Sequence, residues 1–306
     1  GKLAYTVVPK PVAGPADNEI WYTTVDEQIY VPLAYSHYED MLVSNTYKNG
    51  IGVMTLNEKV ERIHERFFST YVNNEAHRIT TIILPSCVKS LDWQSFRGCI
   101  NLKSIILPEG LTSIEGYAFL DCRSLESITI PSTVTSMRYE AHDLNDGTSY
   151  NAYQFEGCYF TRDKFINNSS LDAEANNYWG ALVTDYKTDE CLYYNSNTTV
   201  KYVGESNIVN IPESVEIIGE RTFHNNDYLT INLPSTITTL KECSIGGIEF
   251  ITVNYNGTKE QWNAITKESE WSAYSCAGDY DDFWNDSSFI VNCLDGPVEE
   301  DGRWWA

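Results

Sequence analysis

Positive charge is scarce in this sequence. Its 306 residues include 21 Lys and Arg against 43 Asp and Glu, so the formal net charge is −22. Such a negative field repels phosphate backbones and anionic lipid headgroups. We therefore expect no nucleic-acid partner. The sequence also lacks any apolar run near the ~18 residues of a membrane-spanning helix, so we expect no transmembrane segment.

Motifs of catalysis are also missing. The sequence has no G-x-S-x-G, no glycine-rich phosphate loop, no dinucleotide fingerprint and no C-x-x-C. The stretch from His64 to Phe68 begins like a zinc-protease helix, but Phe68 stands where the second His ligand must be. The five histidines are dispersed, and none has a second His or a Cys two to four residues away. We therefore expect no enzyme activity, no metal and no cofactor.

The N-terminus gives no direct evidence of secretion. The chain begins at Gly1 without Met and has no signal peptide. We interpret it as a processed mature segment from which the leader is missing.

An internal repeat organises the sequence. The stretch from Val88 to Pro131 matches itself at an offset of 23 residues. The matched pairs are Val88/Leu111, Leu91/Ile114, Phe96/Phe119, Cys99/Cys122, Leu102/Leu125, Ile105/Ile128, Leu107/Ile130 and Pro108/Pro131. A period of about 20–29 residues with this apolar spacing is typical of a leucine-rich solenoid.

Each unit of the repeat combines a strand with an apolar wall. Ile105 and Leu107 alternate as on a half-buried strand, and Pro108 ends that strand because it has no N–H to offer. The Leu111-x-x-Ile114 step and Phe119 supply the opposite wall. One unit cannot bury its own apolar face, so stacked units must share a continuous core.

The phrase LTSIEGYAFLDCRSLESITIP (Leu111–Pro131) resembles the BspA-like leucine-rich repeat of surface and secreted proteins of gut and oral bacteria and some protozoa. The resemblance extends over roughly residues 44–295. It implies a mainly β, right-handed leucine-rich repeat solenoid with a parallel sheet on one face, coil or short helical turns opposite, and a cap at each end.

The same resemblance implies a function. Some relatives are adhesins that bind host matrix proteins, so we expect a non-enzymatic extracellular or cell-surface binding and adhesion protein with a protein ligand. The abundance of Tyr and Trp, 21 and 8 residues, leaves a glycan ligand open as the alternative.

A Val-x-x-Ile step recurs along the chain and sets the domain boundaries. Its copies are Val60/Ile63, Val88/Leu91, Leu111/Ile114, Val134/Met137, Val215/Ile218 and Ile237/Leu240. We predict an N-terminal capping segment over 1–50, repeats over 51–255 with insertions at 138–153 and 165–207, and a C-terminal cap with a short helix over 256–306.

Two irregular segments have their own signals. The stretch YWGALVTDYKTDECLYYN (Tyr178–Asn195) has two apolar-rich runs around a polar turn, which predicts a β-hairpin. Thr258 followed by Gln261 has capping-box spacing, which predicts a short helix that lays Trp262 and Ile265 over the last repeat.

Three cysteines occupy one repeat position. Cys99, Cys122 and Cys158 each follow a repeat Phe by three residues, so we predict buried free thiols at stacked positions. Cys87, Cys191, Cys243, Cys276 and Cys293 have no assignment.

The densest acidic cluster contains Asp279, Asp281, Asp282 and Asp286, interleaved with aromatic residues. It lacks the Gly and terminal Glu of an EF-hand loop. We interpret it as a solvated loop, with calcium or a sugar platform as the functional alternatives.

Two sets of residues are candidates for ligand contact. Small uncharged side chains are expected on the exposed strand face, and large rings on a rim formed by the two insertions. The strand-face set contains Thr81, Ile83, Ser104, Ile106, Ser127, Thr129, Ile208, Asn210, Thr230, Asn232 and Thr252. The rim set contains Tyr139, Tyr150, Tyr153, Tyr178, Trp179, Tyr193 and Tyr194. Packing of these rings onto the solenoid is the alternative to a binding rim.

Overall fold

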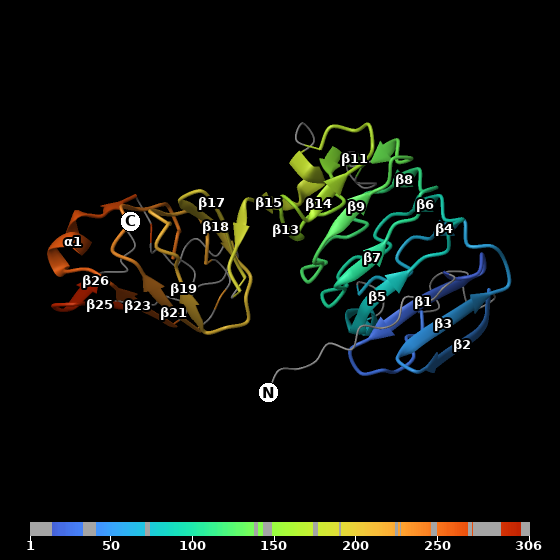
Figure 1. Cartoon of the computed structure of the whole chain (residues 1–306), viewed down its shortest axis with the longest axis horizontal. Coiled ribbons are helices and arrows are strands. Elements are labelled where there is room, and N and C mark those ends of the chain that lie inside the picture. The colour runs from blue at the N-terminus through green and yellow to red at the C-terminus, as the bar shows by residue number, and fades with distance from the viewer. Residues whose placement is uncertain are drawn as a thin grey trace. The chain divides into compact units, whose positions relative to one another are not determined.

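The chain forms two compact units, unit 1 over Gly1–Val183 and unit 2 over Thr184–Ala306 (Figure 1). The computed structural model describes residues 14–32, 41–70, 74–137, 140–142, 149–173, 177–189, 191–223, 226, 228–245, 250–268, 271 and 289–300, with only the backbone at 140–142, 149, 150, 250 and 289. Almost all its described elements are strands, which confirms the predicted mainly β solenoid. The domain boundaries predicted near residues 50 and 255 fall within these units and stay a prediction.

The first sheet of unit 1 joins the N-terminal strands to the repeat strands. Its order is β2 (Leu42–Lys48), β3 (Ile51–Leu56), β1 (Glu19–Thr24), β5 (Ile79–Ile83) and β7 (Ser104–Ile106). β5 and β7 are parallel, with Thr81 opposite Ser104 and Ile83 opposite Ile106. These partners lie 23 residues apart, so the offset in the sequence is the register of the sheet. Farther along, β9 (Ile128–Ile130) pairs in parallel with β14 (Phe165–Asn167).

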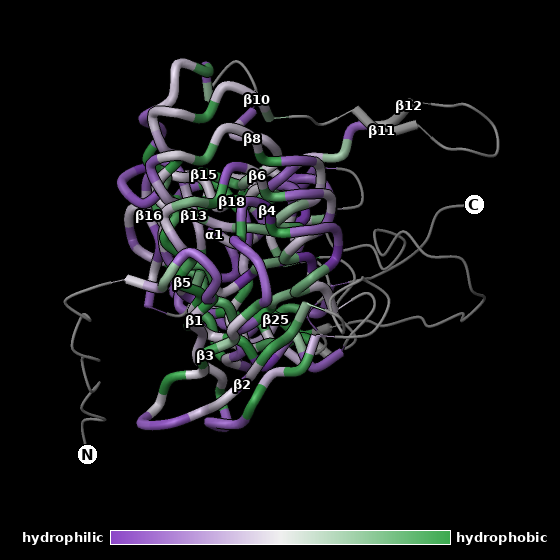
Figure 2. Tube along the Cα trace, turned by 90° about the vertical axis from the view of Figure 1, so that its right-hand side faces the viewer, coloured by the Kyte–Doolittle hydropathy of each residue, from purple (hydrophilic) through white to green (hydrophobic). Residues whose placement is uncertain are grey.

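The wall opposite the first sheet is a second parallel sheet. It consists of two-residue strands in the order β10 (Ser136–Met137), β8 (Ser113–Ile114), β6 (Ser90–Leu91) and β4 (Arg62–Ile63). Each contains the second member of a Val-x-x-Ile step, and that residue is buried in all four. In Figure 2 these coils follow one another, and hydrophobic stretches recur from coil to coil.

A ladder of phenylalanine rings fills the core of unit 1. Phe68, Phe96, Phe119 and Phe155 stack at centroid distances of 5.2, 5.2 and 5.1 Å, with their planes within 6° of parallel. All four are fully buried. The repeat position predicted for Phe is therefore one continuous stack of rings.

The thiols beside this ladder are free and buried, as predicted. Cys99 donates to the carbonyl oxygen of Phe68 at 2.9 Å, and Cys122 and Cys158 donate likewise to Phe96 and Phe119 at 3.2 and 3.1 Å. Each thiol therefore bonds to the preceding coil. Burial raises the pKa of the Cys122 and Cys158 thiols well above their ordinary value.

Tyrosines hold the N-terminal strands to the first coil. The Tyr22 hydroxyl donates to Asn45 and accepts from the Tyr30 N–H, while the Tyr30 hydroxyl donates to the Phe67 carbonyl at 2.8 Å. Gly52 lies opposite Tyr22 on β3, and a Cβ there would come within 2.6 Å of the Tyr22 ring. Only glycine leaves room for that ring.

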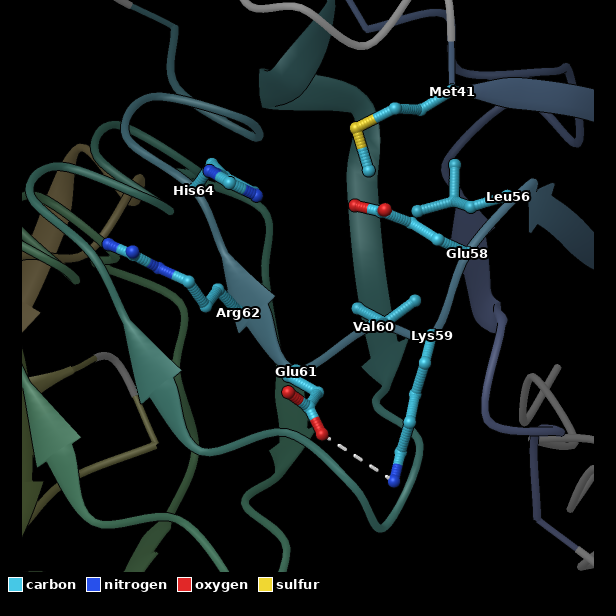
Figure 3. Close-up of a pocket in the computed structure, with 8 residues that line it drawn as sticks. All are labelled: Met41, Leu56, Glu58, Lys59, Val60, Glu61, Arg62 and His64. Atoms are coloured by element: carbon cyan, nitrogen blue, oxygen red, sulfur yellow. Dashed lines mark ion pairs between the residues drawn. The ribbon is translucent and has the colours of Figure 1, made fainter.

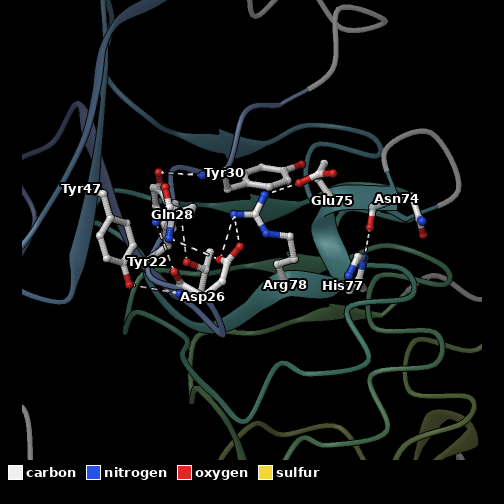
Figure 4. Close-up of polar contacts among 10 residues, drawn as sticks. Tyr22, Asp26, Gln28, Tyr30, Tyr47, Asn74, Glu75, His77 and Arg78 are labelled. Carbon is white, nitrogen blue, oxygen red and sulfur yellow. Dashed lines mark hydrogen bonds and ion pairs between the residues drawn. The ribbon is translucent and has the colours of Figure 1, made fainter.

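Arg78 forms ion pairs in the same region (Figure 4). It ends η1 (Asn74–Arg78), and its guanidinium contacts Asp26 at 2.8 Å and also Glu75. The hydrogen bond from Arg78 lowers the pKa of Asp26.

The two insertions form hairpin and meander elements. β11 (Glu140–His142) and β12 (Ser149–Asn151) form an antiparallel pair within the first insertion. After it, β13 (Tyr159–Thr161) pairs with β15 (Leu182–Thr184), and η2 (Asn177–Gly180) precedes β15. The predicted hairpin is therefore shorter than its sequence pattern, because β15 pairs outside it. It consists of β16 (Tyr186–Lys187) and β17 (Leu192–Asn195), with Tyr186 opposite Tyr194.

Unit 2 repeats the two-sheet plan. One sheet has the order β16, β17, β18 (Thr198–Tyr202), β20 (Ile217–Ile218), β22 (Thr239–Leu240) and β24 (Thr266–Lys267). The other has the order β19 (Ile208–Asn210), β21 (Tyr228–Leu233), β23 (Phe250–Tyr255), β25 (Phe289–Cys293) and β26 (Gly296–Glu300). The first four strands of the latter are parallel, whereas β26 returns antiparallel to β25.

The predicted helix is present in unit 2. α1 (Lys259–Ala264) begins after Thr258, which forms the predicted capping box with Gln261. Trp262 is fully buried, and its indole N–H donates to Glu300. Lys267 pairs with the same carboxylate at 3.2 Å and lies 4.7 Å from the Trp262 ring centroid. These contacts attach β26 to the helix.

Candidate ligand-binding surfaces

The strand faces of both units present the residues expected from the repeat. Along β7, Ser104 and Ile106 are exposed on either side of the buried Ile105, and Thr129 lies likewise on β9. Thr81 and Ile83 are half-buried on β5, and Ser127, just before β9, is exposed. Asn210 on β19 and Asn232 on β21 lie on the corresponding face of unit 2.

An apolar row crosses the strand face of unit 1. Val53 pairs with Trp21, Trp21 with Ile83, and Ile83 with Ile106, so the four side chains follow one another across β3, β1, β5 and β7. Ile106 is 61% exposed, and the other three are partly exposed. The Trp21 indole N–H donates to Glu19 at 2.9 Å, which orients the ring. We name Val53, Trp21, Ile83 and Ile106 the apolar row.

Trp21 corrects one expectation. From the sequence, this face offers small side chains without an aromatic ring, and capping is the role expected of the segment before residue 50. The structure places β1 antiparallel to β5, so Trp21 lies beside Ile83 on the same face. Nothing local in the sequence indicates this pairing, since 62 residues separate the two side chains.

An amide ladder crosses the strand face of unit 2. Asn232 donates to the side-chain oxygen of Asn210 at 2.8 Å, Asn254 donates to Asn232 at 2.8 Å, and Asn292 donates to Asn254 at 2.9 Å. We name these four residues the amide ladder. The sequence could have predicted that Asn254 belongs to the ladder, since it follows Asn232 by the same 22 residues that separate Asn232 from Asn210. Asn292 lies beyond the repeat pattern, so nothing in the sequence predicts its place in the ladder.

The predicted rim of aromatic rings is only partly described. Tyr139 and the side chain of Tyr150 lie outside the described residues. Tyr153 and Tyr178 of unit 1 are half-buried, and their hydroxyls contact Asn151 and Arg162. Trp179 is 1% exposed against Phe165.

Tyr193 and Tyr194, the two remaining rings predicted from the second insertion, lie in unit 2. Tyr193 is 4% exposed with Lys187 over its face, and Tyr194 stacks on Tyr186 at 5.1 Å. Trp179 and Tyr193 are therefore buried where they stand, and we exclude both from any proposed contact surface.

A pocket of about 440 Å³ lies beside the first coil of unit 1 (Figure 3). Met41, Leu56 and Val60 supply its apolar lining, with Glu58, Lys59, Glu61, Arg62 and His64 around them. Lys59 pairs with Glu61 and Asp17 at 3.6 Å, and Arg62 pairs with Asp92 at 2.7 Å. The cations are thus matched by carboxylates, and the lining contains no Ser or Cys to act as a nucleophile.

Within the described ranges, no three His, Cys, Asp or Glu side chains gather as a metal site. The acidic cluster at Asp279, Asp281, Asp282 and Asp286 lies outside those ranges.

Comparison with protein families decides the identity of the repeat. The model of the BspA type leucine-rich repeat region, in six copies, matches residues 44–149, 70–172, 143–251 and 194–267. The chain belongs to the BspA-type leucine-rich repeat family. The matched ranges run over both units and include the apolar row except Trp21, and the amide ladder except Asn292. Membership of this family indicates a binding or adhesion role.

Two solved structures resemble this BspA-type chain. A leucine-rich cell-surface protein of Faecalibacterium prausnitzii is 18% identical, with a TM-score of 0.23, over 64% of this chain and 64% of that one. The pneumococcal vaccine antigen PcpA is 14% identical, with a TM-score of 0.30, over 74% of this chain and 75% of that one. The chain thus spans just under two thirds of the length of the first structure. No curated protein matches the chain.

In the part of the chain that the structure describes, no helix is both long and apolar enough to span a bilayer.

Proposed function

We propose that this protein is a non-enzymatic extracellular or cell-surface protein that binds a protein partner through the apolar row of unit 1. The row itself is the observation that supports this proposal. Side chains of Val, Trp and two Ile lie contiguously on a sheet face, and Ile106 is 61% exposed. Contiguous exposed apolar surface on a soluble protein marks a contact site.

The composition of the row favours a protein ligand. β3, β5 and β7 contain no charged residue, and β1 contains only Glu19. The cores of protein interfaces are depleted in charge and enriched in aromatic residues, and Trp is common among residues that dominate binding energy. Trp21 has that character, and its hydrogen bond to Glu19 reduces the freedom it would lose on binding.

The extracellular assignment has support besides the family. Cys243 is disulfide-bonded, and such bonds persist in oxidising compartments. The free thiols at Cys99, Cys122 and Cys158 do not oppose this, because they are buried and bonded to backbone carbonyls.

The tyrosines of the insertions take a secondary place in this proposal. The Tyr178 hydroxyl accepts a hydrogen bond from Arg162, and the Tyr153 hydroxyl accepts one from Asn151, so both rings already have intramolecular roles. We therefore propose that the partner contacts the strand face and not these tyrosines.

The test is a binding assay on immobilised extracellular-matrix proteins such as collagen, laminin and fibronectin. We expect saturable binding to at least one, weakened about tenfold or more by Ile106→Glu and by Ile83→Glu, because tenfold corresponds to ~1.4 kcal/mol. Ile208→Glu is the matched control, since Ile208 is similarly exposed but lies on unit 2. Absence of saturable binding to every protein, or wild-type binding by Ile106→Glu, overturns the proposal.

A glycan ligand is the second candidate function. The observation that favours it is the amide ladder of unit 2, which lies on the same face as the exposed ring of Tyr228. Hydrogen-bonding amides beside an aromatic ring suit a sugar better than they suit an apolar protein patch.

A further inference from the structure

We propose that the strand face of unit 2 is a binding site for a neutral polysaccharide, held by the amide ladder and by the side chains next to it. This inference rests on the second candidate function above and gives it a place, a set of contacts and a ligand class.

The hydrogen-bonding capacity of the ladder is only half used. A side-chain amide has two N–H donors and an oxygen with two lone pairs. Asn232 uses one N–H to donate to Asn210 and one lone pair to accept from Asn254. Asn254 likewise donates to Asn232 and accepts from Asn292. Each therefore keeps one N–H and one lone pair for a ligand. The ladder bonds also fix the orientation of these groups before a ligand arrives, which lowers the entropy lost on binding.

A row of hydroxyl groups runs beside the amides. Thr230 lies opposite Thr252 in the register, two residues before Asn232 and Asn254. Within the described part of the chain, neither hydroxyl makes a hydrogen bond. The two rows form a grid spaced by ~4.8 Å across the strands and ~6.6 Å along them.

The face carries no charge on its four parallel strands. β19, β21, β23 and β25 contain no Asp, Glu, Lys or Arg, although 21% of the whole chain is charged. Glu299 of β26, opposite Ile290, borders the face. With a formal net charge of −22, the protein repels an anionic polymer, and without a cation here nothing on these strands attracts one.

Exposed apolar side chains flank the polar grid. Ile208 is 52% exposed, Tyr228 56% and Ile290 54%, and all three lie on the same face as the threonines and asparagines. Sugars present both hydroxyl groups and C–H faces. The C–H faces can pack on the Tyr228 ring and the isoleucines, while the hydroxyls exchange hydrogen bonds with the grid.

A neutral polysaccharide is the occupant that satisfies both features. Each sugar hydroxyl both donates and accepts, so it matches an amide or a threonine at any position. A flat protein ligand would bury the amide groups of the ladder. Each amide group that then lacks a hydrogen-bond partner costs binding energy. The uniform, repeating grid instead suits a ligand that itself repeats.

Affinity electrophoresis of the whole chain tests this proposal, with gels containing mannan, laminarin, xyloglucan or dextran as neutral probes and polygalacturonate as the anionic probe. We expect retardation by at least one neutral polysaccharide and none by polygalacturonate. Asn232→Ala should weaken the retardation at least tenfold in apparent affinity.

Two further variants distinguish loss of binding from loss of folding. Tyr228→Ala removes an exposed ring without breaking the ladder and should also weaken binding severalfold. Asn207→Ala, an exposed asparagine outside the ladder, should bind like wild type. Retardation by no neutral polysaccharide, retardation by polygalacturonate alone, or equal retardation of wild type, Asn232→Ala and Tyr228→Ala overturns the proposal.

Ile106→Glu separates this site from the protein-binding site of unit 1. It should lose the matrix-protein interaction and keep the polysaccharide interaction. If Ile106→Glu abolishes polysaccharide binding and Asn232→Ala does not, the ligand lies on unit 1 and the inference is wrong.

Discussion

The side-chain amide of Asn292 donates a hydrogen bond to the side-chain oxygen of Asn254, 2.9 Å away and 38 residues earlier in the chain. Val253 and Val291 pair beside them in the same parallel register. β25 therefore continues the strand face of the repeats, although the residues between the two strands do not follow the repeat pattern.

The amide ladder should contribute to the stability of unit 2. Asn254→Ala removes two hydrogen bonds, one to Asn232 and one from Asn292. Each hydrogen bond is worth about 0.5–1.5 kcal/mol, so we expect a loss of about 1–3 kcal/mol in unfolding free energy, measured by urea denaturation. Asn207→Ala is the control and should change little. An unchanged midpoint for Asn254→Ala would mean that the ladder does not stabilise the fold.

A mutation in the phenylalanine ladder should lower the unfolding free energy more than a mutation in the amide ladder. Phe119 stacks between Phe96 and Phe155 and is fully buried, so Phe119→Ala leaves a cavity in the middle of the ladder. We expect a loss of about 3–5 kcal/mol. Ile106→Ala, at a 61% exposed position, serves as the control in the same denaturation experiment. A Phe119→Ala protein as stable as wild type would require a different alignment of the repeats.

The thiols of the ladder should resist alkylation. The thiolate is the reactive form, and burial both raises the pKa of Cys122 and Cys158 and blocks access to them. With iodoacetamide and peptide mapping, we expect half-exposed Cys191 to be labelled in the native protein, and Cys99, Cys122 and Cys158 only after unfolding. Labelling of native Cys122, or a Cys99–Cys122 disulfide, would contradict the structure.

The Asp26–Arg78 pair should make stability depend on acid pH. The hydrogen bond from Arg78 lowers the pKa of Asp26 in the folded state below the unfolded value of about 3.9. Its stabilisation is therefore fully present above the unfolded pKa and is lost as pH falls through the folded-state pKa.

The measurement is the thermal midpoint from pH 7 to pH 3. Asp26→Asn should lower the midpoint at pH 7 and leave it closer to wild type at pH 3. Because Asp26 is exposed, we expect a small effect. Glu213→Gln removes one exposed carboxylate elsewhere and should run parallel to wild type. Equal midpoints for Asp26→Asn and wild type throughout would show that the pair contributes nothing.

The repeat strands and the Phe and Cys positions were predictable because their apolar spacing recurs. The second sheet was not, since a two-residue strand such as Ser113–Ile114 has no alternation to detect. A left-handed residue lies two positions before Phe68, Phe96, Phe119 and Phe223, at Arg66, Gln94, Tyr117 and Arg221. None of these is the Gly, Asn or Asp that signals such backbone, so packing of the coils imposes it.

The candidate surfaces were predictable only in part. Ile83, Ile106, Asn210 and Asn232 follow from alternation within repeat strands. Trp21 joins the apolar row through a long-range antiparallel pairing, and Asn292 joins the amide ladder across a segment without repeats. Both contacts depend on tertiary structure that no local pattern encodes.

The central claim is that ligands contact the strand face and not the turns that carry the tyrosines. Site-specific photo-crosslinking to a bound matrix protein tests it most directly, with benzoylphenylalanine placed in turn at Ile106, at Tyr153 and at Ile208. We predict a covalent adduct from the position of Ile106 and none from those of Tyr153 and Ile208. An adduct from the position of Tyr153, with none from that of Ile106, would contradict the claim.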